Sequence, residues 1–463
     1  MQENKIELNY LSKLNRLRFV LTGILLVALF LSVFSIQAQN GTLSPLTRYG
    51  IGEIDFPNQA RNIGMGGTIL SQSNDEIEPN RSLNLENPAS LSSIGYMHSA
   101  IDLGANVKWY NIASAQGSKT RFQGNMDYFS IGFNLISKKR ENSTPGNVMG
   151  MAFGYKALSR VGYSLTSGDS LSKDTTLYKG NGGGNSAFLA FGIKPWKYIS
   201  IGLTGTFHWG DLDRSQEFIP NLDSSLLKIS NQSVDNFTGF QLKTGVLGEI
   251  PVGKNTCLKL GGIVELGTTL KNAHTDYLYN YRLTSDGLKV VRDTIFYERK
   301  SNSNIKLPLA FGGGISWVDK GKYQIAFDWY NQTWSSVSSS YQSNLRDLTR
   351  YSFGVEYTPN LQTTEQLNKL KRFLRRTSYR LGFYYLQNNT LIKGNTLEQI
   401  GITAGLGIKL PPPTRYSPPS IVNIGIELAE RGSLTEVGIR ERLARIYISV
   451  TINDLWFKKR KYD

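Results

Sequence analysis

The feature that most constrains the fold is a two-residue alternation of apolar and polar side chains, repeated along most of the chain. In IVNIGIELAE, residues 421–430, the even positions 422 to 428 are apolar, and Asn423, Gly425 and Glu427 lie between them. QIGITAGLGIKL (399–410) and RIYISVTIND (445–454) alternate in the same way. A period of two is that of a β-strand with one apolar face. The pattern predicts an all-β protein.

Extending this pattern along the chain predicts fourteen strands, an even number. Their expected ranges are 97–111, 124–136, 148–158, 185–193, 199–210, 237–250, 256–268, 305–317, 323–332, 350–358, 377–387, 399–410, 420–430 and 442–457. Short turns alternate with long polar stretches, which we expect to be loops near 159–184, 211–236, 269–304 and 333–349.

Strands of about ten residues, with short turns on one side and long loops on the other, are typical of outer-membrane barrels. Lipid offers no hydrogen-bond partners, so such a sheet must close on itself. We therefore expect a transmembrane antiparallel β-barrel over residues 97–457. A β-sandwich or a large soluble barrel is the rival, but it does not require an export signal together with uniform strands and alternating loop lengths.

The N-terminus has the three parts of an export signal. Residues 1–18 carry basic side chains, Phe19–Phe34 has no charge, and Ala38 is a small residue suited to cleavage. We expect residues 1–38 to be a signal peptide that is removed. A membrane-anchoring helix is the alternative, because the apolar stretch approaches the length of a short span.

The formal charge of +16 first suggests nucleic acid as a partner. Nearly the whole excess falls in the predicted short turns and in the basic tail, residues 458–463, of an exported protein. Lipid headgroups, or simply water, are better partners for such a rim. One turn, residues 363–376, has a capping-box pattern at Thr363 and Gln366 and leucines at helical spacing. It predicts a short basic amphipathic helix that lies on the membrane or docks a periplasmic partner.

Charged residues within the predicted strands fall on the face opposite the apolar one. They are Asp102, Lys108, Lys156, Lys243, Lys259, Glu265, Lys306, Asp328, Glu356, Arg380, Lys409 and Glu427. The two signs nearly balance, whereas an ion-selective pore favours one sign. These side chains either pair with one another or with a plug, or they line a wet lumen.

Residues 39–96 lack the alternation and precede the first strand, so they are the candidate plug. Within them, RNIGMGGTIL (61–70) looks like a phosphate-binding loop, but it has neither glycine spacing of such loops and no lysine follows. Glycine also permits close backbone approach and positive φ. We therefore interpret Gly64, Gly66 and Gly67 as packing and hinge positions.

RNIGMGGT followed by NPASL, which includes Asn87, Pro88 and Ala89, resembles the FadL family of outer-membrane transporters for long-chain fatty acids and other hydrophobic compounds. The resemblance implies a fourteen-stranded barrel with an N-terminal hatch that contains these six residues. It also implies passive transport of a hydrophobic or amphipathic small molecule. FadL-like barrels include subunits of outer-membrane secretion and assembly machines, so a non-transporting subunit of a larger complex is the alternative.

Nothing in the sequence points to an enzyme, a cofactor or a metal site. The single Cys257 excludes a disulfide framework, and His98, His208 and His274 have neither ligand spacing nor a nucleophile motif beside them. We expect a protein of the outer membrane of a Gram-negative (diderm) bacterium, with both termini periplasmic. Its expected partners are outer-membrane lipid, a hydrophobic ligand and further outer-membrane or periplasmic proteins.

Overall fold

The computed structural model describes most of residues 42–455. The described residues are 42–54, 59–73, 82–95, 97–138, 146–168, 174–220, 227–284, 286–300, 303–319, 322–337, 345–359, 368–392, 394–412 and 418–455. The expected signal peptide and the basic tail lie outside these ranges, as do Thr363 and Gln366.

The described chain is dominated by long antiparallel strands. They are β1 (His98–Ser114), β2 (Gly117–Lys138), β3 (Gly146–Gly168), β4 (Thr175–Ile193), β5 (Ile199–Ile219), β6 (Lys228–Pro251), β7 (Thr256–Glu265), β8 (Thr268–Leu283), β9 (Lys289–Lys300), β10 (Ile305–Leu307), β11 (Ala310–Asp319), β12 (Tyr323–Gln332), β13 (Leu348–Tyr357), β14 (Thr377–Ile392), β15 (Asn395–Lys409), β16 (Ile421–Ser433) and β17 (Ile439–Leu455). The helical elements are η1 (Pro45–Arg48), α2 (Ala60–Ile63), η2 (Pro88–Ser93), η3 (Trp334–Ser336) and α3 (Lys369–Arg376).

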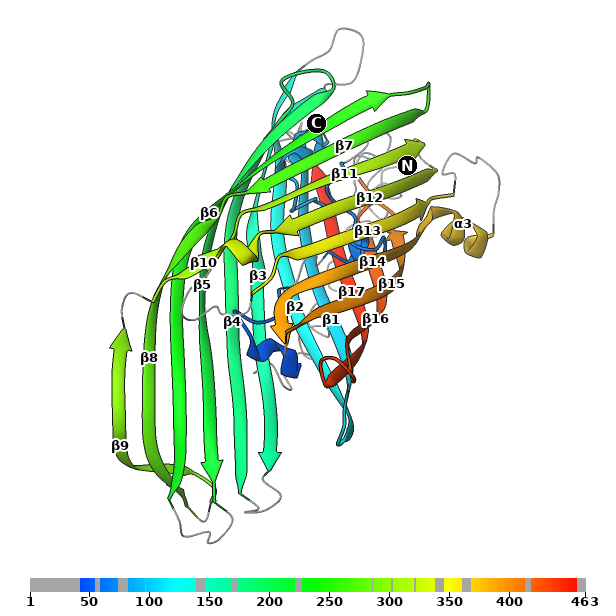
Figure 1. Cartoon of the computed structure of the whole chain (residues 1–463). Helices are drawn as coiled ribbons and strands as arrows, with labels where there is room; N and C mark the ends of the chain where they lie inside the picture. The colour runs from blue at the N-terminus through cyan, green and yellow to red at the C-terminus, as the bar shows by residue number, and fades with distance from the viewer. Residues whose placement is uncertain are drawn as a thin grey trace, which may run out of the picture.

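Fourteen of these strands close into a barrel (Figure 1). Strands β1 to β7 pair in sequence order, β7 pairs with β11, β11 to β17 continue the order, and β17 pairs with β1. The expected barrel of about fourteen strands is thus confirmed. We call the rim where β1 begins and β17 ends the short-turn rim, and the opposite one the hairpin rim.

The apolar stripe of each strand faces outward, and the polar stripe faces the lumen. In β15, Ile400, Ile402 and Leu406 are exposed, whereas Thr403 and Gln399 are buried. This reverses the arrangement of a soluble protein and is that of a barrel whose outer surface meets lipid. Among the described residues, no helix is long and apolar enough to cross a membrane.

The prediction of long polar loops was wrong for three of the four stretches. β3 and β4 extend through most of 159–184, and β5 and β6 through most of 211–236. The stretch 269–304 holds β8 and β9, a hairpin outside the ring whose first strand pairs with the outer half of β6. In these outer halves the outward side chains are mostly polar, whereas Val161, Leu212 and Phe237 face inward and are buried. Backbone pairing therefore continues after the outward apolar stripe has ended. Figure 1 shows this sheet projecting beyond the shorter strands β12 to β14.

One predicted strand, 305–317, is divided into β10 and β11. Pro308 stands at the break and has no backbone N–H to donate to a neighbouring strand. β10 pairs with the start of β8, and β11 takes the place in the ring next to β7. The division leaves the strand count of the ring unchanged.

Candidate functional site: the plug and the charged lumen

The described N-terminal residues 42–54, 59–73 and 82–95, here called the plug, pack against inward-facing residues all around the ring. Helix α2 contacts β15, β16 and β17, whereas η2 contacts β2 to β6 on the other side. Nearly all of the described plug residues are buried. Figure 1 shows these segments inside the barrel.

The glycine motif lies where the plug backbone meets the barrel backbone. Gly66 has φ +70°, and a Cβ there would lie 2.4 Å from the Phe353 carbonyl oxygen and 2.5 Å from that of Phe383. Its N–H donates to Thr403 Oγ1 at 2.9 Å, and its carbonyl accepts from Arg350 at 3.0 Å. Only glycine fits this conformation and this approach without strain.

The other two motif glycines make a similar turn possible. Gly64 caps the C-terminus of α2, and a Cβ there would lie 2.9 Å from the Cα of Gly405. Gly67 has φ +90°, and its N–H donates to the Asn62 carbonyl at 2.8 Å. The motif is therefore a tight turn pressed against strands β13 to β15, with no geometry of a nucleotide site.

Asn87 joins three parts of the structure. Its Nδ2 donates to the Leu70 carbonyl at 2.7 Å and to the Val246 carbonyl of β6 at 3.1 Å, and its Oδ1 accepts from the Ala89 N–H. It is fully buried and caps η2, which begins at Pro88. The NPA pattern thus ties the second half of the plug to the first half and to the barrel wall.

Glu86 forms the first of two ionic latches between plug and barrel. Its carboxylate lies 2.9 Å from Lys156 Nζ and 2.6 Å from Lys243 Nζ, and Lys243 also contacts Glu265 at 2.9 Å. Burial alone would raise the pKa of Glu86, but the two lysine charges outweigh this effect and lower the pKa to about 2.

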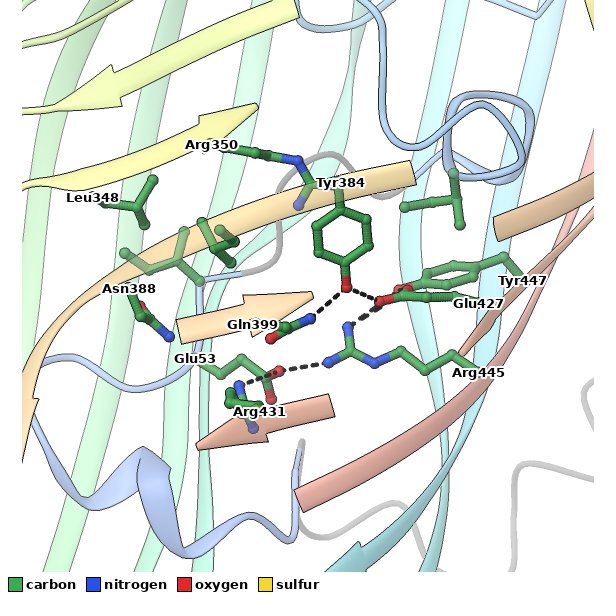
Figure 2. A pocket seen from close by; sticks show the side chains of 13 residues that line it. Glu53, Leu348, Arg350, Tyr384, Asn388, Gln399, Glu427, Arg431, Arg445 and Tyr447 are labelled. Atoms are coloured by element: carbon green, nitrogen blue, oxygen red, sulfur yellow. Dashed lines mark hydrogen bonds and ion pairs between the residues drawn. The ribbon is translucent and has the colours of Figure 1, made fainter. Parts of the chain in front are cut away.

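Glu53 forms the second latch (Figure 2). Its carboxylate lies 3.1 Å from Arg431 Nη1 of β16 and 2.9 Å from Arg445 Nη2 of β17. Burial alone would raise the pKa of Glu53, but the positive charges around it, that of Arg431 foremost, hold the pKa well below its ordinary value. Both plug carboxylates are therefore ionised at neutral pH and bound to cations of the barrel.

The barrel supplies acids to the plug in return. Asp328 of β12 accepts the backbone N–H groups of Ile69 at 2.6 Å and Leu70 at 2.7 Å. Glu356 of β13 lies 3.5 Å from Arg61 Nε of α2, and it also accepts from Arg380 at 2.8 Å. Acidic side chains of the plug thus bind basic side chains of the barrel, and acidic side chains of the barrel bind groups of the plug. These contacts fix the register of the plug within the lumen.

A small cavity remains beside the second latch. It has a volume of about 40 Å³ and is lined by charged and aromatic side chains, including Arg350, Tyr384, Glu427 and Arg445 (Figure 2). Pockets for small molecules usually enclose about 300 Å³ or more and are mainly apolar. This cavity suits one or two water molecules.

Most strand charges expected in the lumen lie on the buried face. Buried are Asp102, Lys108, Lys243, Lys259, Asp328, Glu356, Arg380 and Glu427, whereas Lys156, Glu265 and Lys409 are half-buried. The prediction that Lys306 faces the lumen was wrong, because Lys306 is exposed while its neighbours Ile305 and Leu307 are buried. It lies on β10, outside the ring, where the parity of the predicted strand no longer applies.

The arginines of the second latch were not predicted from the sequence. Arg445 shares the inward parity of Tyr447 and Ser449, so the alternation contained the signal for it. Arg431 has the parity of Glu427 but lies one residue beyond the predicted strand end. Glu53 lies in a segment without periodicity, so no pattern marks it.

His208 has partners that its spacing in the sequence did not reveal. His208 Nδ1 lies 2.8 Å from Ser186 Oγ, and its Nε2 lies 3.0 Å from Gln241 Oε1. In the catalytic triad of a serine hydrolase the third group is a carboxylate, whereas here it is the amide of Gln241. Ser186 is also fully buried. Among the described residues, no group of three or more His, Cys, Asp or Glu could hold a metal ion.

Comparison with protein families gives one match over nearly the whole chain: the model described as BamG covers residues 20–463. No curated protein matches the sequence significantly.

Several solved barrels have the same fold. The P. putida toluene transporter TodX is 15% identical over 87% of this chain and 100% of its own, with a TM-score of 0.56. The Ralstonia pickettii toluene transporter TbuX is 14% identical over 86% and 98%, with a TM-score of 0.54. A Pseudomonas aeruginosa FadL homologue is 11% identical over 88% and 100%, also with a TM-score of 0.54. The expected FadL-type fold is confirmed, and none of the three is described as an enzyme.

Proposed function

The chain belongs to the BamG family, and on this premise we propose that it is a non-transporting barrel subunit of a larger outer-membrane secretion or assembly complex. The observation that carries the proposal is the plug, which is held by buried charges on opposite sides of the lumen. A barrel closed in this way acts through its surfaces.

The cost of moving the plug supports this view. Removing one partner from a buried ion pair costs about 3–5 kcal/mol, and the plug has such pairs at Glu53 and at Glu86. The described cavity is small and polar, so it offers a hydrophobic molecule little apolar area to bury. Opening the lumen would therefore need a source of free energy from outside the barrel.

The β8–β9 hairpin provides a surface for a partner. Among the described strands, β9 pairs with β8 alone, so its other edge has free backbone N–H and C=O groups. Its side chains are almost all exposed, and they include Val291, Ile295 and Phe296. Exposed strand edges and exposed apolar side chains mark sites of protein association.

The test is co-purification of tagged protein from gently solubilised membranes. The variant replaces residues 275–299 with a short turn, and its matched control shortens the β1–β2 hairpin at residues 115–116. We expect a stoichiometric partner with the wild type and the control but not with the variant, and all three should keep a heat-stable barrel. A lone wild-type monomer with bound lipid would contradict the proposal.

Passive transport of a hydrophobic or amphipathic small molecule across the outer membrane is the second candidate. The fold shared with toluene transporters favours it. Uptake of a fluorescent fatty acid or of toluene by liposomes that contain the purified protein tests it. Transport requires saturable uptake above that of empty liposomes, and the subunit proposal predicts none.

The same proposal includes the organisation of the chain. Residues 1–38 are a cleaved signal peptide, residues 39–96 a hatch, residues 97–457 the barrel and residues 458–463 a periplasmic tail. The short-turn rim faces the periplasm in the outer membrane of a diderm bacterium. The hatch motif is Gly64, Gly66, Gly67, Asn87, Pro88 and Ala89.

A further inference from the structure

Helix α3 stands apart from the barrel wall on the short-turn rim, in the connection between β13 and β14 (Figure 1). It covers Lys369–Arg376, so the helical turn predicted within 363–376 is present in its second half. The proposed function does not use this helix.

The helix exposes three large apolar side chains on one side. Leu370, Phe373 and Leu374 are 69%, 47% and 45% exposed. Their spacing of three and four residues places them next to one another on the helix surface. Lys371 and Arg376 are exposed at other positions around the helix. A helix of eight residues is marginal in water, so this arrangement calls for a surface that receives the apolar side.

Two hydrogen bonds fix the helix at the foot of β14. Thr377 Oγ1 donates to the Phe373 carbonyl at 3.0 Å, and Tyr379 OH donates to the Leu374 carbonyl at 3.2 Å. These contacts use the last turn of α3 and leave its apolar side free. The position of the helix is therefore set by the barrel strand that follows it.

A row of tyrosines marks the height of this contact. Tyr379 pairs with Tyr357, and Tyr357 pairs with Tyr323, whose ring is stacked 5.0 Å away. Tyrosine girdles on barrels lie at the boundary between lipid tails and headgroups. Along β14, the next outward residue is Leu381, which is 69% exposed. The hydrogen bond from Tyr379 thus holds the last turn of α3 at the height of this tyrosine row, next to the lipid-facing wall.

We propose that α3 lies in the headgroup region of the phospholipid leaflet that borders the short-turn rim. Leu370, Phe373 and Leu374 enter the acyl-chain boundary, and the basic side chains contact lipid phosphates. Amphipathic helices with basic polar faces bind membranes in this way. The contact of α3 with Tyr379 of the tyrosine row favours lipid over a protein partner.

Site-directed fluorescence tests this placement in the full-length protein. The lone Cys257 is replaced by serine, and single cysteines at Phe373 or Lys371 carry an environment-sensitive fluorophore. Cysteines at Leu381 and at Lys254, an exposed residue of the β6–β7 turn on the same rim, serve as lipid and water references. The protein is reconstituted into vesicles of phosphatidylethanolamine and phosphatidylglycerol.

The expected result is that the probe at residue 373 is quenched by nitroxide on lipid chains and shielded from iodide, like the probe at 381. The probe at residue 371 should be quenched by iodide, like that at 254. If residues 373 and 371 are equally open to iodide, the helix lies in water and the proposal fails. Protection of residue 373 in native membranes but not in vesicles would also overturn it and would indicate a protein partner.

Discussion

At the scale of single residues, the packing of the plug depends on glycines as much as on residues with side chains. Gly66 combines positive φ with two carbonyl oxygens at less than the contact distance of a Cβ. Gly394 also has φ +81°, but nothing lies within 4 Å of the Cβ position. Comparing substitutions at these two glycines therefore separates the free-energy cost of the backbone conformation from that of close packing.

We expect Gly66→Ala to destabilise the protein much more than Gly394→Ala. A left-handed conformation costs an L-residue about 1–2 kcal/mol, and this cost applies to both variants. Only Gly66→Ala must also move the strands that carry Phe353 and Phe383. Thermal unfolding of the two purified variants in detergent measures the difference, and equal melting temperatures would show that the motif is merely a loop.

The side chain of Asn87 joins the two halves of the plug to each other and to the barrel wall. Asn87→Ala leaves the buried carbonyl of Leu70 and the partly buried carbonyl of Val246 without these donors and removes the cap of η2. Each loss costs about 1–3 kcal/mol. We expect a lower free energy of unfolding in urea, with exposed Asn111→Ala unchanged as the control. A neutral Asn87→Ala would mean that the plug relaxes around the missing side chain.

At the scale of elements, the alternation of side chains predicted the strands that have one face toward lipid and the other toward the lumen. Ile400 and Ile402 of β15 had to face lipid, so their stripe located the strand and its inward face. The outer halves of β5 and β6 have no such constraint, and there the backbone ladder continues without an outward apolar stripe. Contacts such as Glu53 with Arg431 join residues far apart in the sequence, so no local pattern could predict them.

The first latch makes the stability of the plug depend on pH. The pKa of Glu86 is about 2 in the folded protein and about 4.3 in an unfolded chain. Because the pKa is lower in the folded protein, the ionised carboxylate stabilises the fold at pH values above the pKa of the unfolded chain. This stabilisation is lost as the pH falls toward 2. The contribution is on the order of 3 kcal/mol at neutral pH.

We expect Glu86→Gln to lower the free energy of unfolding at pH 7 and to flatten its decline below about pH 4.5. Exposed Glu436→Gln is the matched control for the loss of one carboxylate. Urea unfolding at a series of pH values measures both variants. If the free energy of unfolding of Glu86→Gln declines at acid pH with the same slope as that of the wild type, the first latch does not link plug to barrel.

At the scale of the whole molecule, the two candidate functions differ in whether the plug must move. Ser92 of η2 and Ser200 of β5 face each other across the boundary, with 2.9 Å between their Oγ atoms. Cysteines at both positions are close enough to form a disulfide that ties η2 to the wall. The background carries Cys257→Ser, so no other thiol takes part.

We expect the oxidised Ser92→Cys, Ser200→Cys protein to keep its partner and to support growth as well as the reduced protein. A subunit that acts through its surfaces does not need a moving plug, because the buried latches already hold it in place. Each single-cysteine variant controls for the substitutions themselves. Co-purification and growth are measured with and without a membrane-permeable reductant. If oxidation abolishes function and the reductant restores it, plug movement is part of the mechanism, and a conduit for small molecules becomes the better account.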